Sequence, residues 1–288
     1  MQSFTLEFDR FHLELGSNTC IMGILNATPD SFSDGGKFNT VETAVEQGRK
    51  LVEEGAHILD IGGESSRPFA EPVPEQQELD RVIPVIETLS KQIDVPISID
   101  TMKSNVAREA LNAGASIIND ISAFEKDPDM VKLAVQTGVP VVLMHMKGTP
   151  QTMQVDPSYD DLIIEITGYL ASRAAFAMEN GVSKNQIILD PGIGFGKTIE
   201  HNLVLIKHLE KITGLGFPIL MGPSRKSFIH NILSKKEQSP IGPDHVKTEY
   251  GTLAAVAVSL MNGAHIVRVH DVQSVKAFTH IIDSIRNA

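Results

Sequence analysis

The sequence predicts an α/β fold, a (β/α)8 TIM barrel preceded by a short N-terminal β-hairpin. Eight short apolar runs recur along the chain, and segments with helical periodicity separate them. Strands that are hydrophobic along nearly their whole length are typical of a parallel sheet buried on both faces. Eight strand–helix units in about 270 residues fit this barrel, which usually has ~250 residues. A doubly wound open sheet is the competing architecture.

The chain begins with a segment in which apolar and polar residues alternate. Residues 4–8 and 11–15 both show this pattern, and Asp9-Arg10 separates them. Period two on both sides of a short break indicates an antiparallel hairpin, placed within residues 1–18. Because no linker or shift of composition follows, we expect a single domain over residues 1–288.

The eight apolar runs are the predicted barrel strands. Pairs such as Gly55-Ala56 and Gly263-Ala264 precede several of them, which is typical of a helix ending just before a strand. We expect strands at Ile21–Leu25, His57–Ile61, Pro96–Ile99, Ser116–Ile118, Val139–Met144, Gln186–Leu189, Phe217–Met221 and His265–Val269.

Helical periodicity fills the intervals between these strands. Pro84 is expected to kink or delay its helix, and Gly181 is expected to cap the longest one. Residues 234–247 are interpreted as an excursion within the seventh unit. The predicted helices are Val41–Val52, Leu79–Leu89, Tyr159–Glu179, Thr252–Met261 and Val272–Ile285.

Composition narrows the classes of function. The formal net charge of -11 argues against nucleic-acid binding, but local Arg and Lys side chains can still bind small anions. The lone Cys20 has no partner for a disulfide, which fits a reducing compartment. Neither a signal peptide nor an apolar stretch of roughly 18 residues is found. We therefore expect a cytoplasmic protein without a membrane partner.

Polar side chains follow almost every predicted strand. In a barrel the active site lies at the carboxyl ends of the strands. A single Asp at such a place is usually a helix cap, but so many converging groups indicate a binding site. They are Asn26, Asp60, Asp100, Asn119, His145, Asp190, Ser224-Arg225-Lys226, Arg268 and His270.

The residue types indicate a heterocycle and a phosphate. A ring edge with neighbouring N–H groups can pair with a carboxylate at two points, as Arg does, and Lys226 can donate to a ring carbonyl. Arg268 and His270 are two residues apart on a predicted strand, so they should face the same way. With Asn26 they suit a phosphate group.

Two loops carry further signals. Asn26–Gly36, rich in hydroxyls, carboxylates and glycine, follows a buried strand and can enclose a phosphorylated ligand. Asn26 and Asp34 can offer oxygen ligands to Mg2+ beside a diphosphate. Pro191–Thr198 is not a phosphate-binding loop, because Pro191 stands where that motif requires Gly. It instead lets the backbone approach a ligand and places Phe195 over it.

Over residues 20–286 the chain resembles the dihydropteroate synthase family. The Asn26–Gly36 loop and the Ser-Arg-Lys-Ser segment are the specific motifs, whereas the strand-end Asp and Asn residues also resemble pterin-binding methyltransferase domains. The matching segments are Gly23–Gly36, Asp60–Ser65, Ser98–Thr101, Ile118–Asp120, Met144–Met146, Asp190–Lys197, Ser224–Ser227 and Arg268–His270.

The resemblance implies a reaction and its site. The enzyme would join 6-hydroxymethyl-7,8-dihydropterin diphosphate to p-aminobenzoate and release diphosphate, as a cytoplasmic homodimer that sulfonamides target. The pterin would be bound by Asp60, Asp100, Asn119, Met144, Asp190 and Lys226. The diphosphate and Mg2+ would be held by Asn26, Asp34, Arg268 and His270. The p-aminobenzoate would be framed by Ser66, Arg67, Pro68, Phe195 and Ser227. Catalytic roles would fall to Asp100, Lys226, Arg268 and His270.

The chain departs from the family pattern in the loop at residues 62–74. Ser66 replaces a Thr and keeps its hydroxyl, whereas Phe69 replaces a Gly. The Phe69 ring is expected to restrict the backbone or to crowd the p-aminobenzoate side. Two alternatives are a pterin-binding methyltransferase module acting with a corrinoid protein, which needs neither the Asn26–Gly36 loop nor Lys226, and a non-catalytic pterin-binding protein.

Overall fold

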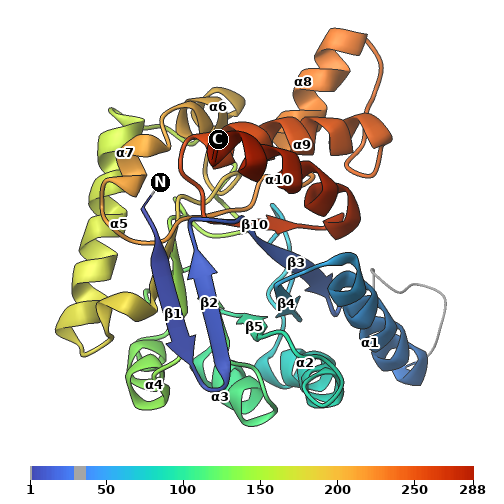
Figure 1. The fold of residues 1–288 in the computed structure, drawn as a ribbon, viewed down its shortest axis with the longest axis vertical. Helices are drawn as coiled ribbons and strands as arrows, with labels where there is room; N and C mark the ends of the chain where they lie inside the picture. Colours follow the sequence, from blue (N-terminus) through green and yellow to red (C-terminus); the bar gives the residue numbers. More distant parts are fainter. Residues whose placement is uncertain (1, 29–36) are drawn as a thin grey trace.

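The computed structural model describes residues 2–28 and 37–288 and shows eight parallel strands surrounded by helices (Figure 1). The strand order is β8-β7-β6-β5-β4-β3-β10-β9. A single bridge between Leu189 and Ile219 joins the two ends of this sheet and closes the barrel. The strands are β3 (Cys20–Asn26), β4 (Ile58–Gly62), β5 (Ile97–Asp100), β6 (Ile117–Asp120), β7 (Val141–Met144), β8 (Ile187–Asp190), β9 (Leu220–Met221) and β10 (Ile266–Val269). The predicted barrel is confirmed.

The N-terminal hairpin closes one end of the barrel. Its strands β1 (Phe4–Phe8) and β2 (Phe11–Leu15) pair antiparallel and lie across the barrel in Figure 1. Leu6, Phe8 and Leu15 pack with inward-facing residues of the barrel strands, including Met22 and Ile188. The alternating sequence therefore forms a plug with one apolar face, and this leaves the carboxyl ends of the strands as the open end.

The helices lie outside the barrel and pack on the outward faces of the strands. A large apolar cluster fills this layer, and residues such as Ile61, Val106 and Leu170 are fully buried in it. The helices are α1 (Lys37–Glu54), α2 (Glu75–Leu89), α3 (Ser104–Asn112), α4 (Asp129–Thr137), α5 (Leu162–Glu179), α6 (Ile199–Lys207), α7 (Glu210–Thr213), α8 (Ser227–Glu237), α9 (Val246–Met261) and α10 (Val272–Arg286), and a short 3-10 turn, η2 (Lys184–Gln186), precedes β8.

Three helix predictions need correction. Helix α2 begins at Glu75 and runs through Pro84, so the proline does not delay it. Helix α5 begins at Leu162 rather than Tyr159, because the Asp161 side chain caps it by accepting from the Ile164 N–H at 3.0 Å. The predicted excursion is only partly irregular: residues 238–245 connect α8 to α9, whereas its first four and last two residues belong to these helices.

Candidate functional site

Arg268 lies at the centre of the open end of the barrel. Its Nε donates to Asp60 Oδ2 at 2.6 Å, and its Nη2 donates to Asp100 Oδ2 at 2.7 Å. Asn119 Nδ2 donates to the same Asp60 oxygen at 3.2 Å. These four side chains come from β10, β4, β5 and β6, so the barrel brings together groups far apart in the sequence.

Burial sets the charge state of this cluster. It raises the pKa of Asp100 to about 7, against the opposing effect of the Arg268 guanidinium. Asp60 is fully buried, and its Oδ1 has no hydrogen-bond partner within the described residues. The Oδ1 atom of Asp60 can therefore accept a further hydrogen bond. Leaving a buried carboxylate oxygen unpaired costs free energy, which such a bond would offset.

Asp190 and Lys226 form the other half of the predicted pterin pocket. Asp190 ends β8, and its Oδ1 accepts from the Gly192 N–H at 2.7 Å. Burial raises the pKa of Asp190 to about 6. Burial, together with the Arg268 charge, lowers the pKa of Lys226 to about 8. A buried acceptor and a half-buried donor thus lie at the same end of the barrel.

An apolar wall borders these two charged groups. Phe195 packs with Met144, Met153 and Ile121 in a small buried cluster. Lys226 Nζ lies 4.0 Å from the centre of the Phe195 ring, which is a cation–π contact. The wall offers a flat, polarisable surface, as a planar heterocycle requires.

His270 and Arg268 have different hydrogen-bond partners. Strand β10 ends at Val269, and His270 Nδ1 lies 2.9 Å from Ser224 Oγ, whereas Arg268 binds the carboxylates. Burial, together with the charge of Arg225, lowers the pKa of His270 to about 3. His270 is therefore neutral at pH 7 and can act as a hydrogen-bond donor, but not as a positive charge.

The predicted metal ligands are only partly described. Asn26 ends β3 and is half-buried beside Gly62 of β4, whereas Asp34 lies outside the described residues. Within residues 2–28 and 37–288, no group of three His, Cys, Asp or Glu side chains could hold a metal ion. The residues described here fit an ion that takes most of its ligands from substrate phosphate and water, as Mg2+ usually does.

The loop at residues 62–74 crosses the surface beside the site. Ser66 is half-buried, and Arg67 and Pro68 are exposed. Phe69 has φ +64°, the left-handed conformation that the family's Gly adopts freely. Its N–H donates to Pro150 O at 3.0 Å, and its ring is 67% exposed. The ring is therefore largely exposed, and it is the backbone of Phe69 that the loop after β7 holds.

Ser224, Arg225 and Ser227 lie next to Lys226 in the sequence but have different surroundings in the structure. Ser227 is exposed at the start of α8, next to Lys226. Arg225 turns away to form ion pairs with Asp244 and Glu249. Sequence reasoning placed Ser224 and Arg225 together at the rim, but only the Ser224 hydroxyl contacts another site residue.

Sequence reasoning assigned no role to Lys197. This lysine is 2% exposed, and its ammonium group lies 2.9 Å from His145 Nδ1 and 2.8 Å from Phe195 O. A lysine inside a glycine-rich strand exit was the available signal. Its burial could not be read from the sequence, because a surface lysine would give the same pattern.

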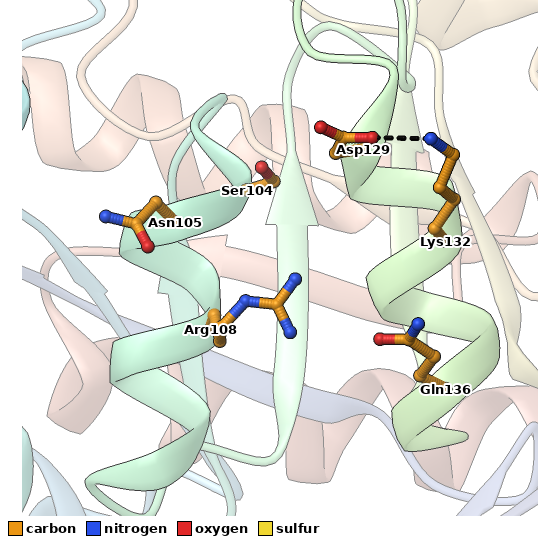
Figure 2. Close-up of a pocket in the computed structure, with 6 residues that line it drawn as sticks. All are labelled: Ser104, Asn105, Arg108, Asp129, Lys132 and Gln136. Atoms are coloured by element: carbon orange, nitrogen blue, oxygen red, sulfur yellow. Dashed lines mark hydrogen bonds and ion pairs between the residues drawn. The ribbon is translucent and has the colours of Figure 1, made fainter.

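A separate hollow lies on the outer surface between α3 and α4 (Figure 2). Its volume is about 440 Å³, and Lys132 Nζ donates to Asp129 Oδ1 there at 2.7 Å. Its lining residues are Ser104, Asn105, Arg108, Asp129, Lys132 and Gln136. None of the predicted site residues lines it, so it is distinct from the open end of the barrel.

The fold and the site define a class of enzyme that binds a planar, nitrogen-rich heterocycle within a TIM barrel. The sequence profile of the family described as pterin binding enzyme matches residues 22–270. The chain belongs to this pterin-binding enzyme family.

Relatives that align over nearly their whole length show which enzymes of this family the chain is similar to. The chain is 48% identical to a dihydropteroate synthase of Synechocystis sp. over 94% of this chain and 91% of that protein. It is 45% identical to the dihydropteroate synthase of Bacillus subtilis over 96% and 91% of the two chains. A solved Xanthomonas albilineans dihydropteroate synthase with 4-aminobenzoic acid is 41% identical, with a TM-score of 0.91 and full coverage of both chains. Within the family, the chain is thus placed among the dihydropteroate synthases, transferases of folate biosynthesis.

These relatives also decide between the synthase and its two alternatives. The methyltransferase module would need neither the Asn26–Gly36 loop nor Lys226, and this chain has both. Identity to synthases over nearly the whole chain favours the synthase. A solved structure of the Xanthomonas albilineans enzyme in complex with 7,8-dihydropteroate also matches over 99% of this chain, with a TM-score of 0.87.

Proposed function

We propose that the pterin ring of the substrate lies at the open end of the barrel, held by Asp100, Asn119, Asp190 and Lys226. The observation that carries this proposal is the convergence of buried carboxylates and an amide around Arg268. Asp190 and Asn119 pair with the pyrimidine edge, Asp100 faces the pyrazine side, and Lys226 donates to the ring carbonyl. Asp60 and Met144 complete the pocket.

The diphosphate binds beside this pocket, near Asn26, His270 and Arg268. The neutral His270 donates a hydrogen bond to a phosphate oxygen, because its Nδ1 is already engaged with Ser224 Oγ. Arg268 supplies positive charge while it remains paired with Asp60 and Asp100. When bound, Mg2+ would be held by Asn26, Asp34 and the diphosphate, and it would stabilise the leaving charge.

The second substrate, p-aminobenzoate, lies between Phe195, Ser227 and the loop carrying Ser66, Arg67 and Pro68. Arg67 lowers the pKa of both Lys226 and His270, so its charge is felt in the site even though its side chain is exposed. An arginine near the mouth can attract the carboxylate of p-aminobenzoate. The nitrogen of that substrate is then presented to the pterin.

The chemistry requires carbon–oxygen bond cleavage more than activation of a nucleophile. The aniline nitrogen already has a free electron pair, so the chain needs no general base for the attack. Diphosphate departs in an SN1-like step, and Asp100 stabilises the positive charge that develops on the dihydropterin. Exclusion of water protects that cation until the nitrogen attacks, and no covalent intermediate with the protein forms.

The order of these steps can be tested with oxygen-18 in the ester position, between the pterin methylene carbon and the diphosphate. Cleavage before attack predicts that the label scrambles into non-bridging positions when p-aminobenzoate is withheld. Asp100→Asn is expected to slow both scrambling and coupled turnover by ~100-fold or more, whereas Asp94→Asn, at an exposed site, should change neither. Fast coupling without scrambling, or a trapped pterin–protein adduct, would contradict the proposal.

A further inference from the structure

Three consecutive carbonyl groups of the turn after β8 are each held by a side chain. Gln154 Nε2 donates to Gly194 O at 2.7 Å, Lys197 Nζ donates to Phe195 O at 2.8 Å, and Tyr159 Oη donates to Gly196 O at 2.7 Å. This turn carries Phe195, whose ring contacts Lys226. A turn bound at three consecutive carbonyls, including that of Phe195, restricts where the Phe195 side chain can lie.

Lys197 is unusual among these three side chains because it carries an ionisable group into the interior. It is 2% exposed, and its ammonium group lies 2.9 Å from His145 Nδ1 and 3.4 Å from His145 O. Burial, together with the charge of Lys197, lowers the pKa of His145 to about 3. The imidazole is therefore neutral, and its Nδ1 accepts a hydrogen bond from Lys197.

These contacts tie two strand exits together. His145 follows β7 and Met144, whereas Phe195 follows β8 and Asp190. Both Met144 and Phe195 belong to the apolar wall of the site. A buried lysine is costly unless it is hydrogen-bonded, and a packed Met or Leu would fill the same volume without that cost. The presence of a lysine here is explained if its three acceptors, His145 Nδ1, His145 O and Phe195 O, must be held in a fixed arrangement.

We propose that Lys197 is a positioning residue that fixes the Phe195 ring against Lys226 by joining the exits of β7 and β8. Lys197 does not touch the substrates. Lys197 holds the Phe195 carbonyl and thereby fixes the Phe195 ring. The ring in turn orients the Lys226 ammonium group that contacts it. This inference rests on the proposed placement of the pterin and p-aminobenzoate.

The role of Lys197 can be tested by comparing Lys197→Met with His145→Asn and His145→Leu in the intact protein. Lys197→Met removes the donor at similar volume and is expected to lower kcat/KM for both substrates by about tenfold. His145→Leu removes one acceptor and should lower it several-fold. His145→Asn restores an oxygen acceptor near the position of Nδ1 and should recover most of the loss. Lys184→Met, whose ammonium lies over the Phe217 ring, is the matched control.

A double-mutant cycle with Phe195→Leu separates positioning from a general structural effect. If Lys197 acts through the Phe195 ring, Lys197→Met should cost less than about twofold in the Phe195→Leu background. An additive loss, or a lower thermal midpoint with unchanged kcat/KM, would overturn the proposal. Pterin binding by Lys197→Met, followed by calorimetry, is expected to persist. If even the wild-type protein failed to bind pterin, the proposed function would fail instead.

Discussion

At the scale of single residues, burial shifts the pKa values of two acids and one lysine of the site toward 7, raising those of the acids and lowering that of the lysine. It raises the pKa of Asp190 to about 6 and of Asp100 to about 7, and it lowers that of Lys226 to about 8. Pterin binding as proposed requires Asp190 ionised and Lys226 protonated. That combination exists only in a narrow range of pH.

We expect the affinity for a pterin without diphosphate to follow a bell-shaped pH profile. It falls as the pH drops through about 6, where Asp190 gains a proton, and as the pH rises through about 8, where Lys226 loses one. Calorimetric titration at each pH measures it, corrected for the ligand's own titration. Lys226→Arg should move the alkaline limb upward by more than about two pH units. An alkaline limb unmoved by this change would contradict the assignment to Lys226.

Residue identities were predictable, but several partnerships were not. The strand-end positions of Asp100 and Asp190 followed from the apolar runs before them, whereas Asp60 lies inside β4, which continues to Gly62. That Arg268 reaches both Asp60 and Asp100 did not, because a long side chain can reach different partners across a barrel interior. The exposed ring of Phe69 depended on a backbone angle that the residue type does not specify.

At the scale of elements, the turn after β8 needs a glycine at the point where it touches the segment that follows β7. Gly192 has φ +70°, and a Cβ placed there would lie 1.9 Å from His145 O. By contrast, Gly168 in α5 is exposed, and a Cβ placed there would meet no other atom within 4 Å. The two glycines thus have opposite consequences when replaced.

We expect Gly192→Ala to lower the free energy of unfolding by about 2–3 kcal/mol and to impair pterin binding. Gly168→Ala should raise it by about 0.5–1 kcal/mol and leave binding unchanged, because alanine loses less entropy in a helix. Denaturant titrations with a pterin-binding assay measure both effects. A Gly192→Ala protein as stable as the wild type would show that the β7 and β8 exits can separate.

At the scale of the whole molecule, the outer face of α9 remains apolar and exposed. Tyr250 is 64%, Val246 55%, Met261 54% and Val258 46% exposed, and they recur at helical spacing on one stripe. On the adjacent α6, Leu203 is 46% exposed. A continuous apolar stripe of this kind indicates a protein interface, and we propose that it joins two copies of this chain in a homodimer.

Among residues 2–28 and 37–288, every helix is too short or too polar to span a bilayer.

We expect the wild-type protein to sediment as a dimer, and Val258→Glu to weaken the dimer at least about tenfold, because it would bury an unpaired charge. Ile164→Glu, at a 70% exposed position on α5, is the matched control and should leave the dimer intact. Analytical ultracentrifugation over a range of concentrations measures both. A monomeric wild type, or a dimer insensitive to Val258→Glu, would refute this interface.

The sequence by itself determined the barrel and the hairpin, and it predicts the end of the barrel at which the candidate site lies. Hydrophobic period and strand-end chemistry are local properties, so they could be read without coordinates. Tertiary structure alone decided the bonding of Arg268 to two carboxylates, of His270 to Ser224 and of Lys197 to His145 and Phe195. Those choices depend on which strands become neighbours when the barrel closes, and on how far each long side chain is buried.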